Sequence, residues 1–323
     1  MNLPIIVVIL AIVYIILSVK LIFFKHPVEK NVLLVIVITE LLIIASFSIP
    51  WIWLSMYFAI INFLLVLSGF ILIFIKLFKK IHRNPLKTSL NTVFILVMAI
   101  LLFFSIIIDL YHDIKTACQT NIAFPLRHGK YTIIQGGSCP SGNLTHFFSS
   151  GSKYGLDIVK FSWWGTMCEF DIPLKSENFL IYGDSVFSPC SGIITKVVYH
   201  VPDHPPFILD NDNSAGNYVI IREDSLKICL SHLKQYSIEV EYGQKVEKGD
   251  FIGLVGNSGR SLIPHLHIHA VWGGDSNTLL QGTPVAISFN QQPVKINNII
   301  LCRKNFTIIL GEFFIYGLFS KTI

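Results

Sequence analysis

The chain has 323 residues, of which 52% are hydrophobic and only 14% are charged, and its formal net charge is +5 at pH 7. Soluble globular domains carry about 25% charged residues, so the chain is too apolar to be one ordinary soluble domain. Its 25 Phe residues also supply far more apolar surface than a disordered chain carries.

The first 110 residues contain long apolar stretches. A run of roughly 17–25 apolar residues can cross a bilayer, and four such runs occur, at about 3–24, 31–49, 52–75 and 89–110. The first run lacks the small-residue cleavage site of a secretory signal, so we expect it to be retained. The sequence predicts a membrane domain of four transmembrane helices over 1–110, with the lipid bilayer as a partner, followed by a second domain over 111–323.

Basic residues flank these four runs unevenly. Lys76, Lys79, Lys80, Arg83 and Lys87 crowd the third connection and three Lys lie around the first, whereas the second connection is uncharged. Cytoplasmic loops are enriched in Lys and Arg. We therefore expect the first and third connections inside the cell and everything after residue 110 outside.

From residue 121 onward the pattern is typical of strands. Short β-branched and aromatic runs such as Tyr131–Ile134, Gly192–Tyr199 and Asn217–Ile221 are bounded by Gly, Pro, Asn and Asp. No stretch keeps a helical period, and Phe306–Ser320 is too short for a fifth span, so strands are expected there. The predicted fold class is multi-domain α + β, with four transmembrane helices followed by an all-β antiparallel domain of sandwich type.

All six cysteines lie in the second domain, at positions 118, 139, 168, 190, 229 and 302. In an exported domain one or more disulfides are expected, but six cysteines allow fifteen pairings and the sequence does not choose among them. Buried free thiols are the alternative. No CxxC pair occurs, which argues against a cysteine-ligated zinc site.

Three histidines alternate with apolar residues in the segment Ile263–Val271, namely His265, His267 and His269. In a strand, this period of two places the three imidazoles on one face and the apolar side chains on the other. A row of imidazoles on one face is typical of a metal-binding and catalytic surface. Chance alternation on a solvated face is the alternative.

Further motifs accompany this segment. They are Tyr154–Ile158, Gly183–Gly192, Leu230–Leu233 followed by Gly243–Gly253, and Gly256–His267. In this order they resemble the lysostaphin-type zinc endopeptidases, which cut peptide cross-links in bacterial cell walls. The resemblance covers roughly residues 124–289. It implies a lysostaphin-like β-sandwich, one Zn²⁺ per domain and peptidoglycan peptides as substrate.

Together with the predicted spans, the resemblance implies a membrane-anchored zinc metalloendopeptidase. It would be a multi-pass protein of the bacterial cytoplasmic (inner) membrane, with its C-terminal domain on the extracytoplasmic side. By position, Asp157 and His267 would be zinc ligands, and His232 and His265 the catalytic imidazoles. One of these imidazoles would take the proton of water and the other would stabilise the oxyanion or protonate the leaving amine. His269 either orients a ligand by a hydrogen bond or continues the strand to the solvent edge.

The remaining ligand of the family is a His that most often lies four residues before the Asp, a position that Lys153 occupies here. A Lys cation cannot bind zinc, so one interpretation is a degenerate domain that binds peptidoglycan or regulates another hydrolase. The other is that His146, in Asn143-Leu144-Thr145-His146 and eleven residues before Asp157, replaces it. We favour His146, because zinc hydrolysis requires three protein ligands and one open position. His128 is a weaker substitute.

Two other classes of function are disfavoured. The first 110 residues hold eight basic and three acidic residues, so the second domain is nearly neutral, which argues against a nucleic-acid partner. Val246–Gly253 also resembles biotinyl- or lipoyl-type carrier domains, but no exposed modifiable Lys in a hairpin is evident.

Overall fold

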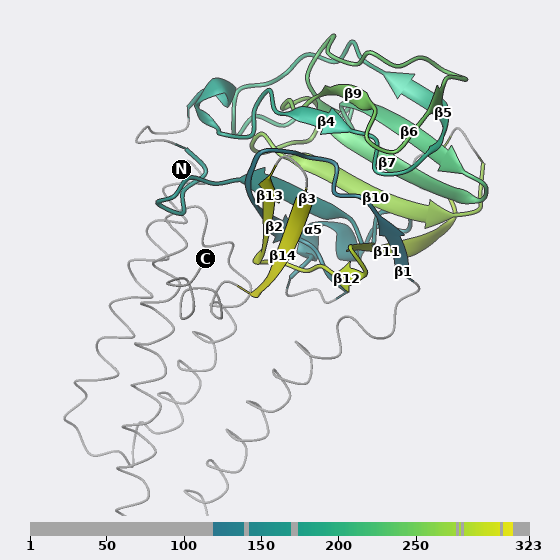
Figure 1. The fold of residues 1–323 in the computed structure, drawn as a ribbon. Coiled ribbons are helices and arrows are strands. Elements are labelled where there is room, and N and C mark those ends of the chain that lie inside the picture. The colour runs from purple at the N-terminus through teal and green to yellow at the C-terminus, as the bar shows by residue number, and fades with distance from the viewer. Residues whose placement is uncertain are drawn as a thin grey trace, which may run out of the picture. The chain divides into compact units, whose positions relative to one another are not determined.

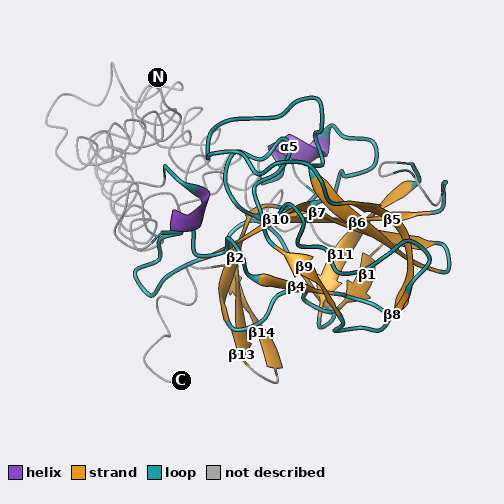
Figure 2. Ribbon diagram, turned by 90° about the horizontal axis from the view of Figure 1, so that it is seen from above, coloured by secondary structure: helices purple, strands orange, loops and turns teal. Residues whose placement is uncertain are grey.

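The computed structural model describes residues 119–138, 142–168, 174–275, 278, 281–303 and 306–312. The chain divides into two compact units, and all of these residues belong to the second unit, Asp113–Ile323. The first unit, Met1–His112, lies outside the described residues. Figure 2 shows that strands and loops make up nearly all of the described part.

The strands are β1 (Gln119–Ile122), β2 (Gly129–Gln135), β3 (Leu156–Lys160), β4 (Ser185–Phe187), β5 (Gly192–Val198), β6 (Asn217–Glu223), β7 (Leu226–Leu233), β8 (Lys245–Val246), β9 (Phe251–Leu254), β10 (Leu266–Trp272), β11 (Thr283–Phe289), β12 (Gln292–Pro293), β13 (Asn298–Arg303) and β14 (Phe306–Glu312). The helices among the described residues are one turn of α-helix, α5 (Leu144–Phe147), and a 3-10 turn at Ser176–Asn178.

Most strands form one large sheet (Figure 1). Its order is β14-β13-β2-β3-β10-β7-β6-β5-β8, and β11 joins β10, β1 and β12 beside this path. β4 and β9 form a separate two-stranded sheet. Neighbours pair antiparallel, as expected, except that β1 pairs parallel with β11. The central strands β3, β10 and β7 are therefore paired on both sides.

The burial of their apolar side chains explains why these segments form central strands. All eight residues of β7 are buried, as expected of a strand inside a sheet. In β10, Leu266, Ile268 and Ala270 belong to the hydrophobic core and are at most 1% exposed. Fully burying a Leu or Ile side chain contributes about 1.5–3 kcal/mol, so this apolar half of the alternation determines which way the histidines of β10 face.

The strand predictions are confirmed where the structure describes them. β2 and β6 contain the predicted runs, β5 covers all of Gly192–Tyr199 but its last residue, and β14 covers the first part of Phe306–Ser320. Among the described cysteines, Cys190, Cys229 and Cys302 are free and buried, which is the alternative to the expected disulfides. Cys118 and Cys139 lie outside the described residues.

The expected fold class needs a correction at its N-terminal half. The four predicted spans lie outside the described residues, and within the described part no helix is both long and apolar enough to cross a membrane. The four residues of α5 rise only about 6 Å, whereas the hydrocarbon core of a bilayer is about 30 Å thick. The structure supports an almost entirely β domain, and the prediction of four transmembrane helices is not supported.

Candidate metal centre

Adjacent strands bring Asp157 and His267 together. His267 of β10 lies directly opposite Asp157 of β3 in the antiparallel register. The two side chains are each 7% exposed, and His267 Nδ1 lies 2.8 Å from Asp157 Oδ1. A carboxylate and an imidazole from distant parts of the chain thus share one buried position on the sheet.

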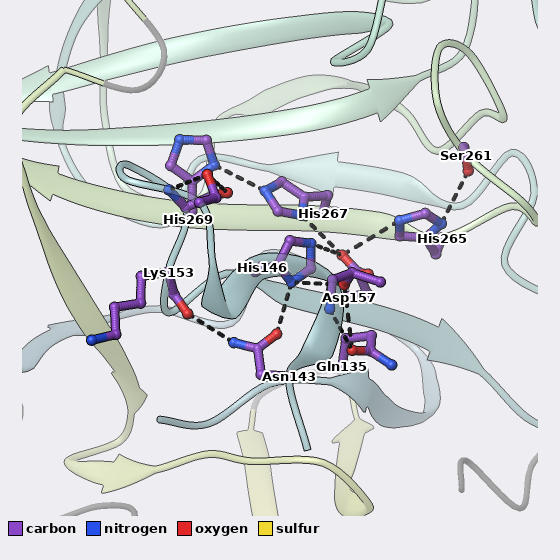
Figure 3. Close-up of polar contacts among 12 residues, drawn as sticks. Gln135, Asn143, His146, Lys153, Asp157, Ser261, His265, His267 and His269 are labelled. Carbon is purple, nitrogen blue, oxygen red and sulfur yellow. Dashed lines mark hydrogen bonds and ion pairs between the residues drawn. The ribbon is translucent and has the colours of Figure 1, made fainter. Parts of the chain in front are cut away.

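The short helix α5 adds His146 to this pair. His146 Nε2 lies 3.5 Å from Asp157 Oδ1, and the rings of His146 and His267 have centroids 4.7 Å apart. One ligand atom from each of the three residues lies within 4.8 Å of the others. Figure 3 shows the three side chains converging from α5, β3 and β10.

Lys153 lies beside this group without entering it. Its ammonium is 5.1 Å from the centre of the Phe147 ring and 5.6 Å from that of Tyr154, and in Figure 3 it points away from Asp157. The Lys153 carbonyl instead accepts a hydrogen bond from Asn143. The chain therefore brings His146, and not the residue four positions before Asp157, to the carboxylate.

Gly155 allows this close approach. A Cβ atom at Gly155 would lie 2.8 Å from His267 Cε1, 3.0 Å from the Ser152 carbonyl oxygen and 3.4 Å from His146 Cγ. Real Cβ atoms essentially never approach as closely as the first of these distances. The backbone before β3 can thus lie close against both imidazoles only because residue 155 has no side chain.

His265 lies against the same carboxylate. Its Nε2 is 3.4 Å from Asp157 Oδ1, and its Nδ1 is 2.7 Å from the Ile263 carbonyl oxygen. The Ser261 hydroxyl lies 3.1 Å from the same Nδ1. Because the carbonyl only accepts, Nδ1 carries the proton and Nε2 faces the centre of the site.

His232 completes the group at the end of β7. Its ring centroid lies 4.7 Å from that of His265, and its Nδ1 donates to the Ser258 carbonyl oxygen at 2.8 Å. Its φ is +62°, a left-handed conformation that costs a non-glycine residue roughly 1–2 kcal/mol. Such strained residues cluster at functional sites.

Of the other two histidines named from the sequence, His269 contacts the site and His128 does not. His269 is only 3% exposed and its Nδ1 lies 2.9 Å from His267 Nε2, so it contacts a member of the site rather than continuing to a solvent edge. His128 is exposed and is not part of the group that could hold a metal ion.

Burial and mutual charge control the protonation of these groups. Burial lowers the pKa of His146 to about 4, although Asp157 opposes this effect. Burial and the neighbouring His265 and His267 hold the pKa of His232 well below its usual value. Burial alone would raise the pKa of Asp157, but His146 and His265 outweigh it and hold that pKa well below its usual range.

The resulting donor set suits zinc. At neutral pH the site presents an ionised carboxylate and at least one neutral imidazole. Two histidines and one carboxylate are a common set of protein ligands in catalytic zinc sites, which keep a fourth position open. His146, Asp157 and His267 therefore have the chemistry that a zinc ion requires.

Comparison with known proteins identifies the domain. Residues 179–279 match the model of Peptidase family M23. These residues form a peptidase M23 domain. The sequence resemblance to lysostaphin-type zinc peptidases is thereby confirmed at the level of the family, which consists of metallopeptidases. The M23 match contains His232, His265 and His267, whereas His146 and Asp157 precede it.

Two curated relatives are similar to a segment of this chain. The peptidoglycan DD-endopeptidase ShyA of Vibrio cholerae serotype O1 is 38% identical over 92 residues, which are 28% of this chain and 21% of that protein. An uncharacterized metalloprotease of Haemophilus influenzae is 33% identical over 97 residues, covering 29% of this chain and 18% of the relative. The chain thus spans about a fifth of the length of these relatives.

Two solved structures are similar to this chain over a third to a half of its length. A zinc containing peptidase from Vibrio cholerae is 31% identical, with a TM-score of 0.24, covering 33% of this chain and 26% of that one. Lysostaphin from Staphylococcus simulans is 18% identical, with a TM-score of 0.26, covering 50% of this chain and 46% of that one.

Sequence reasoning did not assign roles to Asn143, Gly155 or Ser258, which hold the histidines in place. Each belongs to a motif that the sequence shows, but their contacts join residues far apart in the chain. The one local signal is Asn143, a polar residue at 0% exposure, which directly precedes the short helix that carries His146.

Proposed function

We propose that the protein is a zinc-dependent endopeptidase that hydrolyses peptide bonds of peptidoglycan, in cross-links or stem peptides. The observation that supports it most is the convergence of His146, Asp157 and His267, with His232 and His265 beside them. The related peptidoglycan DD-endopeptidase from Vibrio cholerae supports the choice of substrate. Since peptidoglycan lies outside the cytoplasmic membrane, the domain would work in the extracytoplasmic space.

In this proposal His146, Asp157 and His267 hold one zinc ion. Zinc bound at such a site polarises the carbonyl of the scissile bond and makes a water molecule more acidic. The histidine pair does the proton chemistry. His232 and His265 each use Nδ1 to donate to a backbone carbonyl, which leaves Nε2 of each ring to accept a proton and later return it.

These two imidazoles carry out the two proton transfers of the reaction. One takes a proton from the attacking water, and the other donates to the oxyanion or to the leaving amine. Their backbone partners keep both rings in the tautomer and orientation that this exchange needs.

Metal analysis and peptide mapping test the proposal on the purified full-length protein. We expect one zinc per chain, and mass spectrometry of digested peptidoglycan should show new free amino and carboxyl termini. Asp157→Ala and His267→Ala should abolish both. A protein that binds peptidoglycan without zinc and without cleavage would instead be the degenerate binding or regulatory domain.

A further inference from the structure

We propose that the Asn143 side-chain amide is a positioning residue that sets the tautomer of His146, so that the lone pair of Nε2 faces Asp157. The inference rests on the proposed metal site, since it concerns how one of its ligands is prepared. It follows from hydrogen bonds that have only one possible direction.

The orientation of the Asn143 amide is determined by two carbonyl groups. Asn143 Nδ2 lies 3.0 Å from the Gly137 carbonyl oxygen and 3.0 Å from the Lys153 carbonyl oxygen. Both oxygens can only accept, so the NH₂ group must face them and Oδ1 must point the other way. With Asn143 0% exposed, a flipped amide would face these carbonyls with its oxygen and leave buried groups without partners.

The oxygen of this amide then decides where His146 carries its proton. Asn143 Oδ1 lies 2.8 Å from His146 Nδ1 and can only accept. Thr145 Oγ1 lies 3.4 Å from the same nitrogen and gives its own hydrogen to Gln135 Oε1. Every neighbour of Nδ1 is thus an acceptor, so Nδ1 holds the proton of the neutral ring.

A proton on Nδ1 leaves a lone pair on Nε2, the nitrogen that lies 3.5 Å from Asp157 Oδ1. A lone pair that faces a carboxylate has no hydrogen to offer it, and a shared cation satisfies both. His267 differs, because its outer partner is the imidazole of His269, which can donate or accept. The outer neighbour of His146 can only accept and therefore fixes the position of the proton, whereas the outer neighbour of His267 could either donate or accept.

The same amide holds together the segments around His146. Gly137 follows β2, and Lys153 precedes β3, so Asn143 links both flanks of the loop to the start of α5. This explains how a His eleven residues before Asp157 can reach the position usually supplied by a closer one.

Nitrogen NMR of the imidazoles in the metal-free full-length protein tests the inference. His146→Gln identifies the His146 signals by their loss. We expect the Nδ1–H tautomer at His146 in the unmodified protein. In Asn143→Ala, the ring should change to the Nε2–H form and donate to Asp157, and zinc should bind about 10–100-fold more weakly, as when other outer partners of metal ligands are removed.

Asn143→Asp separates the tautomer from the folding of the loop. It keeps an acceptor oxygen for His146 but loses both amide donors, so the Nδ1–H tautomer should persist even if the loop is less stable. Thr145→Val, which removes the longer contact and the hydrogen bond to Gln135 but keeps the Asn143 amide, should leave the tautomer and the affinity for zinc unchanged.

Two results overturn the inference: an Nε2–H tautomer at His146 in the unmodified metal-free protein, or an unchanged tautomer in folded Asn143→Ala. The tautomer is measured without metal or substrate, so the result does not depend on whether the protein has peptidase activity. A protein with the expected tautomer that cleaves no peptide would refute the proposed function and leave the inference standing.

Discussion

Single residues decide whether this domain has a complete site. Lys153 occupies the position where the resemblance to lysostaphin-type peptidases implies a ligand, so the sequence alone leaves two interpretations, a degenerate site or the favoured ligand His146. In the structure the Lys153 ammonium lies over aromatic rings while His146 Nε2 faces Asp157. This geometry supports our proposal that the departure from the family pattern is a change in spacing.

Substitution of His146 by alanine should remove zinc, whereas substitution of Lys153 by alanine should not. We expect His146→Ala to lose zinc and hydrolysis together, because two remaining donors hold zinc poorly. Lys153→Ala should keep one zinc per chain and near-normal activity. Elemental analysis after gel filtration measures both, and zinc bound equally by the two variants would contradict the relocation of the ligand.

His232 should affect turnover without affecting the metal. It contacts His265 but is not one of the three residues that could hold an ion, so His232→Ala should retain zinc. Its rate should fall by about 10²–10⁴-fold, the usual contribution of general acid–base catalysis. His128→Ala, which removes an exposed histidine, is the control, and kcat is the quantity to compare. Zinc loss in His232→Ala would show that His232 has a different role.

The elements of the site differ in how far a sequence can predict them. The alternation of Leu266, Ile268 and Ala270 with histidines predicts one imidazole row, because the pleat alone determines it. The helix α5 has no such signal, since it is a single turn with no buried residues. Its place depends on Asn143 contacts to carbonyls of two other segments, which only the folded chain reveals.

The turn between α5 and β3 gives a prediction at this scale. Gly155→Ala would place a methyl group 2.8 Å from His267 Cε1, so the ring must move, and zinc should bind at least about tenfold more weakly, as when metal ligands lose their support. Isothermal titration with zinc measures the change.

Gly183→Ala is the matched control for that substitution. Gly183 has a φ of +80° and nothing within 4 Å of an added Cβ, so alanine there strains the backbone by roughly 1–2 kcal/mol without contacting a residue of the site. Equal loss of zinc affinity in both variants would mean that stability, and not the His267 ring, explains the effect.

At the scale of the whole molecule, the sequence predicts the β domain better than its limits. The described part consists of strands and the loops between them, with only two short helical turns, as expected, whereas the four predicted spans lie outside it and are not supported by any described helix. The M23 match begins at residue 179, yet His146 and Asp157 precede it. The parallel pairing of β1 with β11 likewise joins segments that no local pattern connects.

Because the site joins such distant segments, zinc should stabilise the entire domain. A ligand that binds only the folded state adds about 2.7 kcal/mol at a concentration 100 times its dissociation constant. Chelation should therefore lower the urea midpoint of the protein. Asp157→Asn should show no difference with and without zinc, and a midpoint insensitive to chelator in the unmodified protein would contradict a metal shared between these segments.

The backbone around the three candidate donors is not held equally strongly. Asp157 and His267 belong to neighbouring strands whose backbones are paired on both sides, whereas the third donor lies on one turn of helix held by a few side-chain hydrogen bonds of Asn143 and Thr145. Opening a sheet requires many hydrogen bonds to break at once, whereas a lone turn can unfold locally. An ion would thus enter and leave past His146, and the speed of exchange would follow the opening of that turn while the strands of the sheet stay paired.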